Sequence, residues 1–385
     1  MITKLVIKNF KSFKNETTID FMKTNYKVLD EPNVADNGVL KGTVFVGANA
    51  SGKSNALHAI RLLLDLLFME KEVNSGLFAC LFSDKPEFSL EYYFKIDDKE
   101  IRYFFEFDAK KTMLSEKLYI DSKVLLERMG ITAKSYITDN ENYSDLDKET
   151  LFLRTVYFNT RFAGNDILRK WFDFLQCSIY LNAFDRKVLS YGKQDFRIAK
   201  YIEEKGTDEI NQFFENYKFD QVIDYANEAK GEHVVIKYNK DEEKMLFFKR
   251  KGINTPIPFG EESLGNRTLL NLLPAFLYVA QHNGMLLIDE FSSGFHNELE
   301  ELLVKYFMNI AKRSQMIFVS HSTNLLSTSI LRPDQIYAVD FDGQNGSHIK
   351  RFSNEQPRVA QNIEKMYLSG VFGGLPKYRD AYEDK

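Results

Sequence analysis

Residues 43–54, TVFVGANASGKS, carry the pattern with the clearest chemistry in this chain. A β-branched run leads to Gly47, four residues follow, and the segment ends in Gly52, Lys53 and Ser54. The two glycines allow backbone N–H groups to surround a triphosphate. Lys53 supplies a positive charge to the β and γ phosphates, and Ser54 supplies a hydroxyl ligand for Mg²⁺. The segment therefore predicts a binding site for a nucleoside triphosphate.

A helix is predicted directly after this loop. Ala56, Ile60, Leu63, Leu64 and Leu67 recur at helical spacing in the stretch SNALHAIRLLLDLLF. A helix that starts at the loop directs its N-terminal dipole at the phosphates. The residues expected to contact the nucleotide on this side are Gly47, Asn49, Ala50, Ser51, Gly52, Lys53, Ser54 and Asn55.

Two apolar segments later in the chain end in side chains suited to nucleotide hydrolysis. MLLIDEF ends a predicted buried strand with Asp289, which can hold Mg²⁺, and Glu290, which can orient and deprotonate an attacking water. IFVSHS places His321 at the end of another predicted strand, where it can reach a γ-phosphate oxygen and the same water. We therefore predict Glu290 and His321 as catalytic residues, and Asp289 with Ser54 as metal ligands.

A second anion-binding feature lies far along the chain from the first loop. In GEESLGNRTLLNLL at 260–273, Ser263, Leu264 and Gly265 come just before an apolar, helix-forming run. A hydroxyl and free N–H groups at a helix N-terminus attract anions. Because the chain already has a full phosphate cradle, Ser263 and Gly265 predict a second nucleotide contact.

The order of predicted elements indicates an α/β fold with four parts. Residues 1–85 hold two strands, the phosphate loop and its helix. Residues 86–160 hold β-rich pieces that predict an antiparallel sheet, followed by an exposed polar loop from 138 to 160. Residues 161–230 are predicted as a helical lobe. Residues 231–385 return to strands and then alternate helix with strand, which favours a largely parallel sheet.

Within the last part, the predicted elements have definite limits. We expect helices at 263–281 and 297–312, and strands at 285–289, 315–320 and 335–340. The helical pattern of the third part runs from about 164 to 228 without a sustained heptad, which favours a compact lobe over a long coiled coil.

Composition narrows the class of protein. The chain has 385 residues with 44% hydrophobic content, enough for one large domain or two lobes that share a core. A net charge of −4 argues against a surface that coats nucleic acid indiscriminately. Cys80 and Cys177 lack metal-site spacing and fit a reducing compartment. No long apolar stretch or signal-peptide pattern is present, so we expect a cytoplasmic protein that does not enter a membrane.

Two short segments leave direct nucleic-acid binding open. KMLFFKRKG at 244–252 interleaves basic and aromatic residues, but acidic residues at 241–243 adjoin it, and a solvated hairpin is the favoured interpretation. RTVYFNTRF at 154–162 places Arg154 and Arg161 near aromatic residues and is equally ambiguous.

The motifs together resemble those of a known family. GANASGKS at 47–54, ESLG at 262–265, MLLIDE at 285–290 and VSHS at 319–322 occur in the order found in ABC-type ATPase heads of the RecF and SMC group. The resemblance implies an ABC-type P-loop NTPase head with a mixed sheet, an antiparallel β subdomain and an inserted helical lobe. In such heads the signature of one protomer closes over the nucleotide of the other, which implies an ATP-sandwiched homodimer or higher homo-oligomer.

A narrower resemblance involves both ends of the chain. LVIKNFKSF at 5–13, DEFSSGFH at 289–296, LRPDQIYAVDFD at 331–342 and KMYLSGVFGGLPKY at 365–378 are similar to the stand-alone RloA-like ATPases of bacterial restriction-linked and abortive-infection loci. It implies a role in anti-phage defence and an effector protein, a nuclease or toxin, that is encoded nearby. The segment from about 90 to 230 is covered only loosely.

Carried over residue by residue, the resemblance assigns the following roles. Lys53 and Ser54 contact phosphate and Mg²⁺, and Asp289 is the Mg²⁺ carboxylate. Glu290 is the catalytic base, and His321 is the switch histidine. Ser263 and Gly265 would contact the γ-phosphate across the dimer, with ATP and Mg²⁺ as the cofactors.

Four features depart from the family pattern or lack a role. The signature has Asn266 and Arg267 in place of its second glycine and the following residue, which predicts weaker or differently gated dimer closure. Ser292 and Ser293 replace an aspartate that often follows the acid pair. No glutamine completes the Mg²⁺ site, since the first candidate, Gln176, lies in a helical run. His296 has no assigned role, and a helix cap is an equally good interpretation.

Three functional hypotheses follow. The leading one is an ATPase whose nucleotide-driven dimerisation controls or scaffolds an effector in anti-phage defence, for which nucleic acid is not required. The second is a RecF-like repair clamp that binds DNA directly and predicts salt-sensitive, ATP-stimulated binding. In the third the nucleotide is only structural, and the protein is an assembly scaffold with almost no turnover.

Overall fold

The computed structural model describes residues 1–137, 141–237, 243–293 and 296–376. Several sequence segments discussed above extend outside these residues: 138–140 of the predicted loop, 241–242 of the acidic run, 294–295 of DEFSSGFH, and 377–378 of the tail.

The centre of the fold is a mixed, mainly parallel sheet. Its strand order is β11-β10-β17-β18-β3-β19-β20, and the neighbours from β10 through β19 are parallel while both edge strands are antiparallel. The strands are β3 (Gly42–Val46), β10 (Ile179–Asn182), β11 (Lys187–Ser190), β17 (Met285–Asp289), β18 (Gln315–Val319), β19 (Ile336–Phe341) and β20 (Ser347–Arg351). This arrangement confirms the predicted parallel sheet in the C-terminal part.

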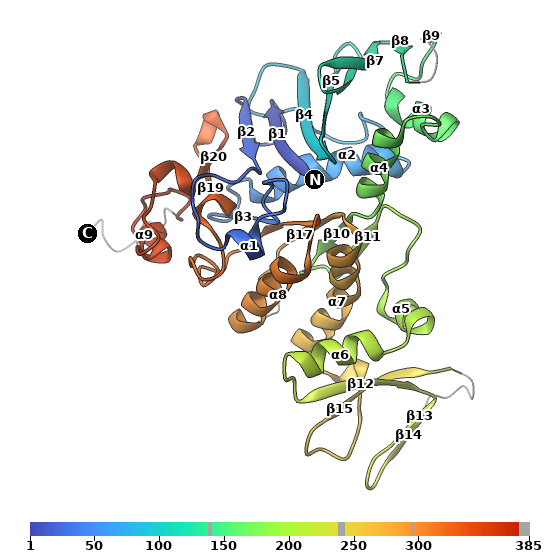
Figure 1. The fold of residues 1–385 in the computed structure, drawn as a ribbon, viewed down its shortest axis with the longest axis vertical. Coiled ribbons are helices and arrows are strands. Elements are labelled where there is room, and N and C mark those ends of the chain that lie inside the picture. Colours follow the sequence, from blue (N-terminus) through green and yellow to red (C-terminus); the bar gives the residue numbers. More distant parts are fainter. Residues whose placement is uncertain (138–140, 238–242, 294–295, 377–385) are drawn as a thin grey trace.

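A second, antiparallel sheet lies above the first (Figure 1). Its order is β2-β1-β4-β5-β6-β7-β8-β9, which confirms the antiparallel sheet predicted for 86–137 and adds the two N-terminal strands to it. The strands are β1 (Ile2–Lys8), β2 (Thr17–Asp20), β4 (Glu87–Ile96), β5 (Lys99–Asp108), β6 (Met113–Ile120), β7 (Lys123–Met129), β8 (Thr132–Ser135) and β9 (Glu141–Tyr143).

Helices divide the interior into two apolar cores. Helix α2 (Lys53–Phe68), with α3 (Phe152–Thr160) and α4 (Asp166–Gln176), packs between the two sheets, and α7 (Leu264–His282) and α8 (Asn297–Ile310) cover the other face of the central sheet.

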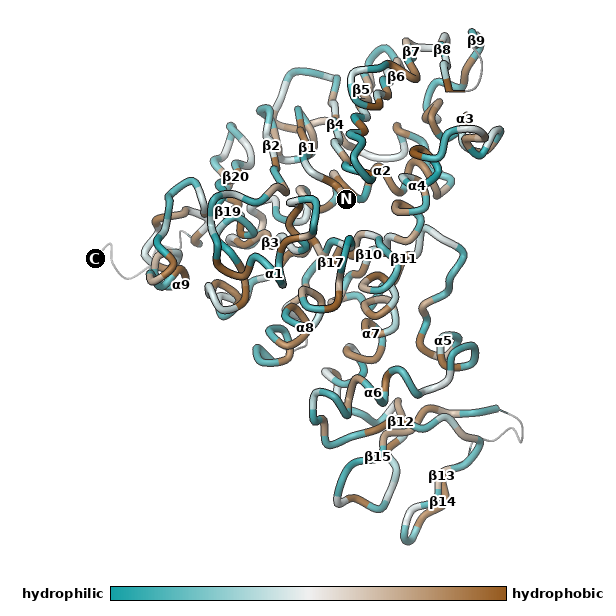
Figure 2. The backbone as a smooth tube through the Cα atoms, in the orientation of Figure 1, coloured by the Kyte–Doolittle hydropathy of each residue, from teal (hydrophilic) through white to brown (hydrophobic). Residues whose placement is uncertain are grey.

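The side chains of β17 point alternately into the two apolar cores. Met285 and Leu287 of β17 face the α2 side, whereas Leu286 and Ile288 face α7 and α8. Successive strand residues point to opposite faces, so a central strand covered on both sides must be apolar throughout. Figure 2 shows hydrophobic residues alternating with hydrophilic ones along α7 and α8, as expected for helices with one buried face. None of the described helices combines the length and apolar character that crossing a bilayer requires.

A smaller unit extends away from the central sheet (Figure 1). We call it the distal module. It contains α5 (Ile198–Lys205), α6 (Asp208–Asn216), β12 (Gln221–Ala226), β13 (Glu228–Lys230), β14 (Val235–Lys237), β15 (Met245–Arg250) and β16 (Ile257–Pro258). Helix α7 begins directly after it and leads back to the body. Two short helices belong to the body instead: α1 (Asp30–Asn33) packs against α8, and α9 (Ile363–Leu368) contributes Ile363 and Tyr367 to the core that α7 and α8 cover.

The helical pattern predicted for 164–228 is wrong in part. Residues 179–182 form β10 inside the central sheet, and residues 221–226 form β12 of the distal module. β10 is only a short apolar segment, and β17 beside it supplies the backbone partners that make it a strand. The segment 244–252 is likewise no solvated hairpin, because Phe247 and Phe248 of β15 are fully buried.

The exposed loop predicted for 138–160 is also wrong at its end, where α3 spans Phe152–Thr160. Its first free N–H groups, those of Phe152 and Leu153, donate to the carboxylate of Glu116 on β6 at 2.7 and 3.2 Å. Glu116 is fully buried and is also bonded by Arg128 Nη1 at 3.1 Å and by Tyr103 Oη at 2.7 Å. The cap of this helix therefore comes from a distant strand.

Removal of this buried carboxylate should be costly. Glu116→Ala is expected to lower the free energy of unfolding by about 3–5 kcal/mol, since it leaves the buried Arg128 without its carboxylate partner and uncaps α3. Denaturant titration of the variant measures the loss. A matched control is Glu127→Ala on β7, whose pair with Lys117 at 3.5 Å is exposed to solvent and should change stability by about 0.5 kcal/mol or less. Similar losses for both variants would contradict the prediction.

Candidate functional site

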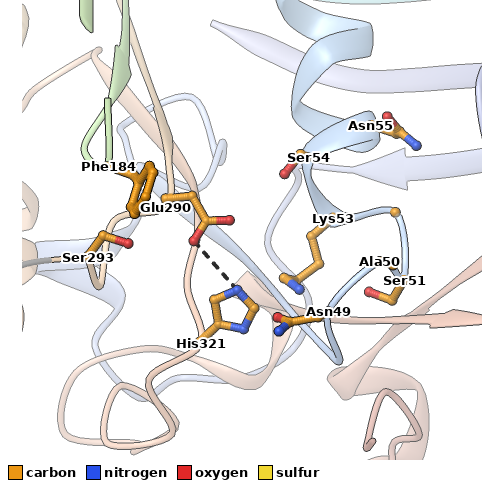
Figure 3. A pocket seen from close by; sticks show the side chains of 11 residues that line it. Asn49, Ala50, Ser51, Lys53, Ser54, Asn55, Phe184, Glu290, Ser293 and His321 are labelled. Atoms are coloured by element: carbon orange, nitrogen blue, oxygen red, sulfur yellow. Dashed lines mark ion pairs between the residues drawn. The ribbon is translucent and has the colours of Figure 1, made fainter. Parts of the chain in front are cut away.

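Neighbouring strands of the central sheet end at one pocket. β3, β18, β17 and β10 are parallel neighbours, so their carboxyl ends lie at the same edge. A pocket of about 990 Å³ lies there, and Figure 3 shows the side chains around it. It is lined by Asn49, Ala50, Ser51, Gly52, Lys53, Ser54, Asn55, Phe184, Glu290, Ser293 and His321. The sequence-predicted loop, catalytic base and histidine therefore meet in space.

The phosphate loop has the backbone that its glycines predict. Gly47 and Gly52 have φ angles of 153° and 106°, in the region that favours glycine. A Cβ at Gly47 would lie 2.3 Å from the carbonyl oxygen of Val339, and one at Gly52 would lie 2.2 Å from Ser347 Oγ. The loop is thus packed closely against β19 and β20, which leaves no room for side chains at these positions.

Lys53 lies at the centre of this loop. Its Nζ donates to the carbonyl oxygens of Gly47 at 3.0 Å and Ala48 at 2.8 Å, and the residue is buried. Burial lowers the pKa of the Lys53 ammonium, while the carboxylates of Glu290 and Asp289 oppose this shift. The loop therefore holds one cation beside the acid pair, where a triphosphate requires it.

The predicted metal ligands are already in contact. Ser54 Oγ donates to Asp289 Oδ1 at 2.9 Å, and Asp289 is buried at the end of β17. A hydroxyl and a carboxylate that share one oxygen-lined position are the hard ligands that Mg²⁺ takes beside substrate phosphates. The residues present therefore fit this cation.

Glu290 and His321 lie side by side on the wall of the pocket that faces the phosphate loop (Figure 3), with His321 Nε2 at 3.6 Å from Glu290 Oε2. Glu290 follows β17 with a positive φ of 54°, which turns its carboxylate away from the strand. Burial, followed by the charge of Lys53, lowers the pKa of His321, and Glu290 opposes this. The backbone N–H of His321 donates to Ser292 Oγ at 3.2 Å. A carboxylate and a neutral imidazole at this spacing can together hold and deprotonate one water.

Ser263 and Gly265 do not belong to this pocket. Ser263 is exposed at the N-terminus of α7, where its hydroxyl accepts a hydrogen bond from the Asn266 N–H at 3.3 Å. The adjacent Leu264 has 48% of its surface exposed. Within one copy of the chain, these residues are absent from the lining of the nucleotide pocket.

Sequence reasoning missed two residues at the site. His58 lies one turn beyond Ser54 on the same face of α2, and its Nε2 is 3.9 Å from Asp289 Oδ2. Burial lowers the pKa of His58 to about 4, against the opposing charge of Asp289. The spacing of four residues from Ser54 was a signal available in the sequence. Phe184, 72% exposed after β10, lines the pocket only because β10 lies beside β17.

Two residues without an assigned role lie elsewhere. Gln176 ends α4 and donates to Tyr157 Oη at 2.9 Å, so it does not complete the metal site. His296 caps α8, since its Nδ1 accepts from the Glu298 N–H at 3.4 Å. The helix-cap interpretation of His296 is therefore confirmed.

Solved structures of SMC heads are similar to this chain. The SMC head domain from Thermotoga maritima matches with 15% identity and a TM-score of 0.48, covering 90% of this chain and 97% of that one. An SMC head bound to the C-terminal winged-helix domain of ScpA matches with 15% identity and a TM-score of 0.51 over the same shares. The latter likeness confirms the ABC-type P-loop NTPase head as the fold.

Sequence comparison supplies the family. No curated protein matches the chain significantly. Residues 43–327, well over half of the chain, match the family model described as "AAA domain, putative AbiEii toxin, Type IV TA system". This span runs from the phosphate-loop strand past the switch histidine and so includes every predicted site residue. The chain therefore belongs to this AAA domain family, and its fold is that of a P-loop ATPase head.

Proposed function

We propose that this protein binds ATP with Mg²⁺ and hydrolyses it in a sandwiched homodimer in the bacterial cytoplasm. The dimerisation controls or scaffolds an effector, a nuclease or toxin encoded nearby, in anti-phage defence. One observation supports the sandwich: the P-loop, Asp289, Glu290 and His321 lie together at one pocket, while the exposed Ser263 of the signature is not among the residues of the same copy that line it. The resemblance to RloA-like ATPases supports the defence role.

The chemistry follows from the residues present. When bound, Mg²⁺ would be held by Ser54 and Asp289 and would neutralise charge on the phosphates. Lys53 binds the β and γ phosphates. Glu290 orients the attacking water and takes its proton, and the adjacent His321 holds the same water and the γ-phosphate. The second copy contributes the Ser263 hydroxyl and nearby N–H groups, which exclude water and complete the phosphate contacts.

A partner protein is consistent with this fold. One solved SMC head is bound to a winged-helix domain of ScpA. In the present chain we propose that an effector responds to the nucleotide-dependent closure of the dimer.

Subunit mixing tests the sandwich. Lys53→Ala removes the phosphate-binding cation of the P-loop, and Ser263→Arg prevents the signature from contacting the nucleotide. Each variant alone should therefore be inactive. In the mixed dimer, the P-loop of the Ser263→Arg chain meets the signature of the Lys53→Ala chain, and one intact site forms. With random exchange of equal amounts, we expect about a quarter of the wild-type ATPase rate.

The control mixes two chains that carry the same defect. Lys53→Ala mixed with a chain that carries both substitutions leaves no intact P-loop and should stay inactive. A lack of recovery in the first mixture, with both chains folded, would contradict the sandwich. ATPase activity of Ser263→Arg alone at the wild-type rate would contradict it as well.

A further inference from the structure

The signature turn is attached to the distal module by an amide pair. Gln221, the first residue of β12, is 5% exposed. Asn266 Nδ2 donates to Gln221 Oε1 at 3.0 Å, and Gln221 Nε2 donates to Asn266 Oδ1 at 3.4 Å. Asn266 is one of the departures from the usual signature, and here it connects the first turn of α7 to a strand more than forty positions earlier in the chain.

An ion pair whose carboxylate is buried makes a second attachment. Arg250, the last residue of β15, donates from Nη2 to Glu262 Oε1 at 2.7 Å, and the side chain of Glu262 is only 3% exposed. The same oxygen accepts the N–H of Ser263 at 2.6 Å. Burial raises the pKa of Glu262, but the Ser263 N–H, the charge of Arg250 and the side chain of Asn266 together hold that pKa below its usual range. The carboxylate therefore holds the backbone of the signature serine directly.

The two attachments act on opposite sides of Ser263. Glu262 precedes it and is bound by β15, whereas Asn266 follows it and is bound by β12. β12 and β15 are paired along their whole length, from Gln221 with Arg250 to Ala226 with Met245. The sheet formed by β12 and β15 is thus bonded to the turn on both sides of Ser263. Ser263 and Leu264 remain exposed between the two bonded residues.

We propose that the distal module is a positioning element for the signature, and that Gln221 and Arg250 set the direction in which Ser263 meets the nucleotide of the second copy. The inference rests on the proposed sandwich. Neither residue touches the nucleotide, so both are positioning residues. A misplacement of about 1 Å at a reacting phosphate can cost on the order of 100-fold in rate. A shift of β12 and β15 relative to α7 would therefore change the rate of ATP hydrolysis while the P-loop keeps its structure.

The mixed dimer provides a test that a general folding defect cannot imitate. In the mixture of Lys53→Ala with Ser263→Arg, only the Lys53→Ala chain supplies a working signature. Gln221→Ala placed in that chain should lower the rate of the mixture about 10-fold or more. In the Ser263→Arg chain the signature is already inactive. The same substitution placed in that chain should therefore leave the ATPase rate of the mixture unchanged. Arg250→Ala should show the same asymmetry.

Two variants of β15 serve as matched controls. Arg250→Lys keeps the charge beside Glu262 and should recover part of the rate that Arg250→Ala loses. Lys249→Ala removes an exposed cation that bonds Asp224 at 2.6 Å, away from the signature, and should have no effect in either chain.

The outcomes separate this inference from the proposed function. If the parent mixture recovers activity but Gln221→Ala and Arg250→Ala act equally from both chains or from neither, the positioning role is wrong and the sandwich stands. If the parent mixture never recovers activity, both ideas are overturned. Asymmetric loss with partial recovery by Arg250→Lys supports the inference.

Discussion

Glu290→Gln should slow ATP hydrolysis by about 10²–10⁴-fold, the usual contribution of a general base. An amide keeps the shape of the side chain but cannot accept the proton of the attacking water. Lys53, Ser54 and Asp289 are unchanged, so ATP still binds and the dimer can close. Because ATP is not hydrolysed, the closed dimer does not open again. We expect the ATP-bound dimer, or a higher assembly, to accumulate, with light scattering showing a larger mass with ATP than without it.

The control for this variant is Glu298→Gln, which makes the same change of charge on the exposed first turn of α8. Its rate and mass should match the wild type. A Glu290→Gln protein whose mass does not change on addition of ATP would count against the sandwich. DNA cleavage by the purified protein that survives Glu290→Gln would count against an ATPase that works through a separate effector.

Lys53→Ala should weaken ATP binding by about 100-fold, because it removes the buried cation from the centre of the phosphate loop. Titration of a fluorescent ATP analogue measures this loss directly. Hydrolysis and ATP-dependent assembly should disappear together. Lys305→Ala, which removes an exposed lysine of α8 paired with Glu301 at 3.5 Å, is the control and should bind ATP normally.

The same variant distinguishes the alternative hypotheses. If the nucleotide is only structural, wild-type turnover is close to zero, and Lys53→Ala changes the size of the assembly rather than a rate. If the protein is a RecF-like clamp, the wild type binds DNA in an ATP-stimulated manner that weakens steeply with salt, and Lys53→Ala loses that stimulation. An effector-controlling ATPase requires neither result.

Much of the site could be predicted because each of its motifs is a short run of neighbouring residues. The loop from Gly47 to Ser54 carries its own glycines, cation and helix start, and the structure keeps that order. Asp289 ends one apolar strand and His321 follows another, and parallel strands in one sheet bring their carboxyl ends together. Local pattern and sheet geometry point to the same pocket, which is why Lys53, Glu290 and His321 meet as expected.

Other features depended on contacts between distant segments. β10 is a strand because β17 pairs with it, and Phe184 reaches the pocket only through that pairing. Helix α3 starts where the buried Glu116 of β6 accepts its first N–H groups. Neither signal is visible in a window of neighbouring residues, since short segments adopt the structure that their tertiary partners stabilise.

The amino-acid sequence by itself determined the nucleotide chemistry of this protein, because phosphate cradle, carboxylates and histidine are specified by residue type at short spacing. Only the tertiary structure decided how the signature is held. Asn266 appears in the sequence as a departure from a motif, and it gains a role only when β12 brings Gln221 to it. The physical reason is that a hydrogen bond between side chains depends on where the backbone carries both partners, and here the fold of the distal module does so.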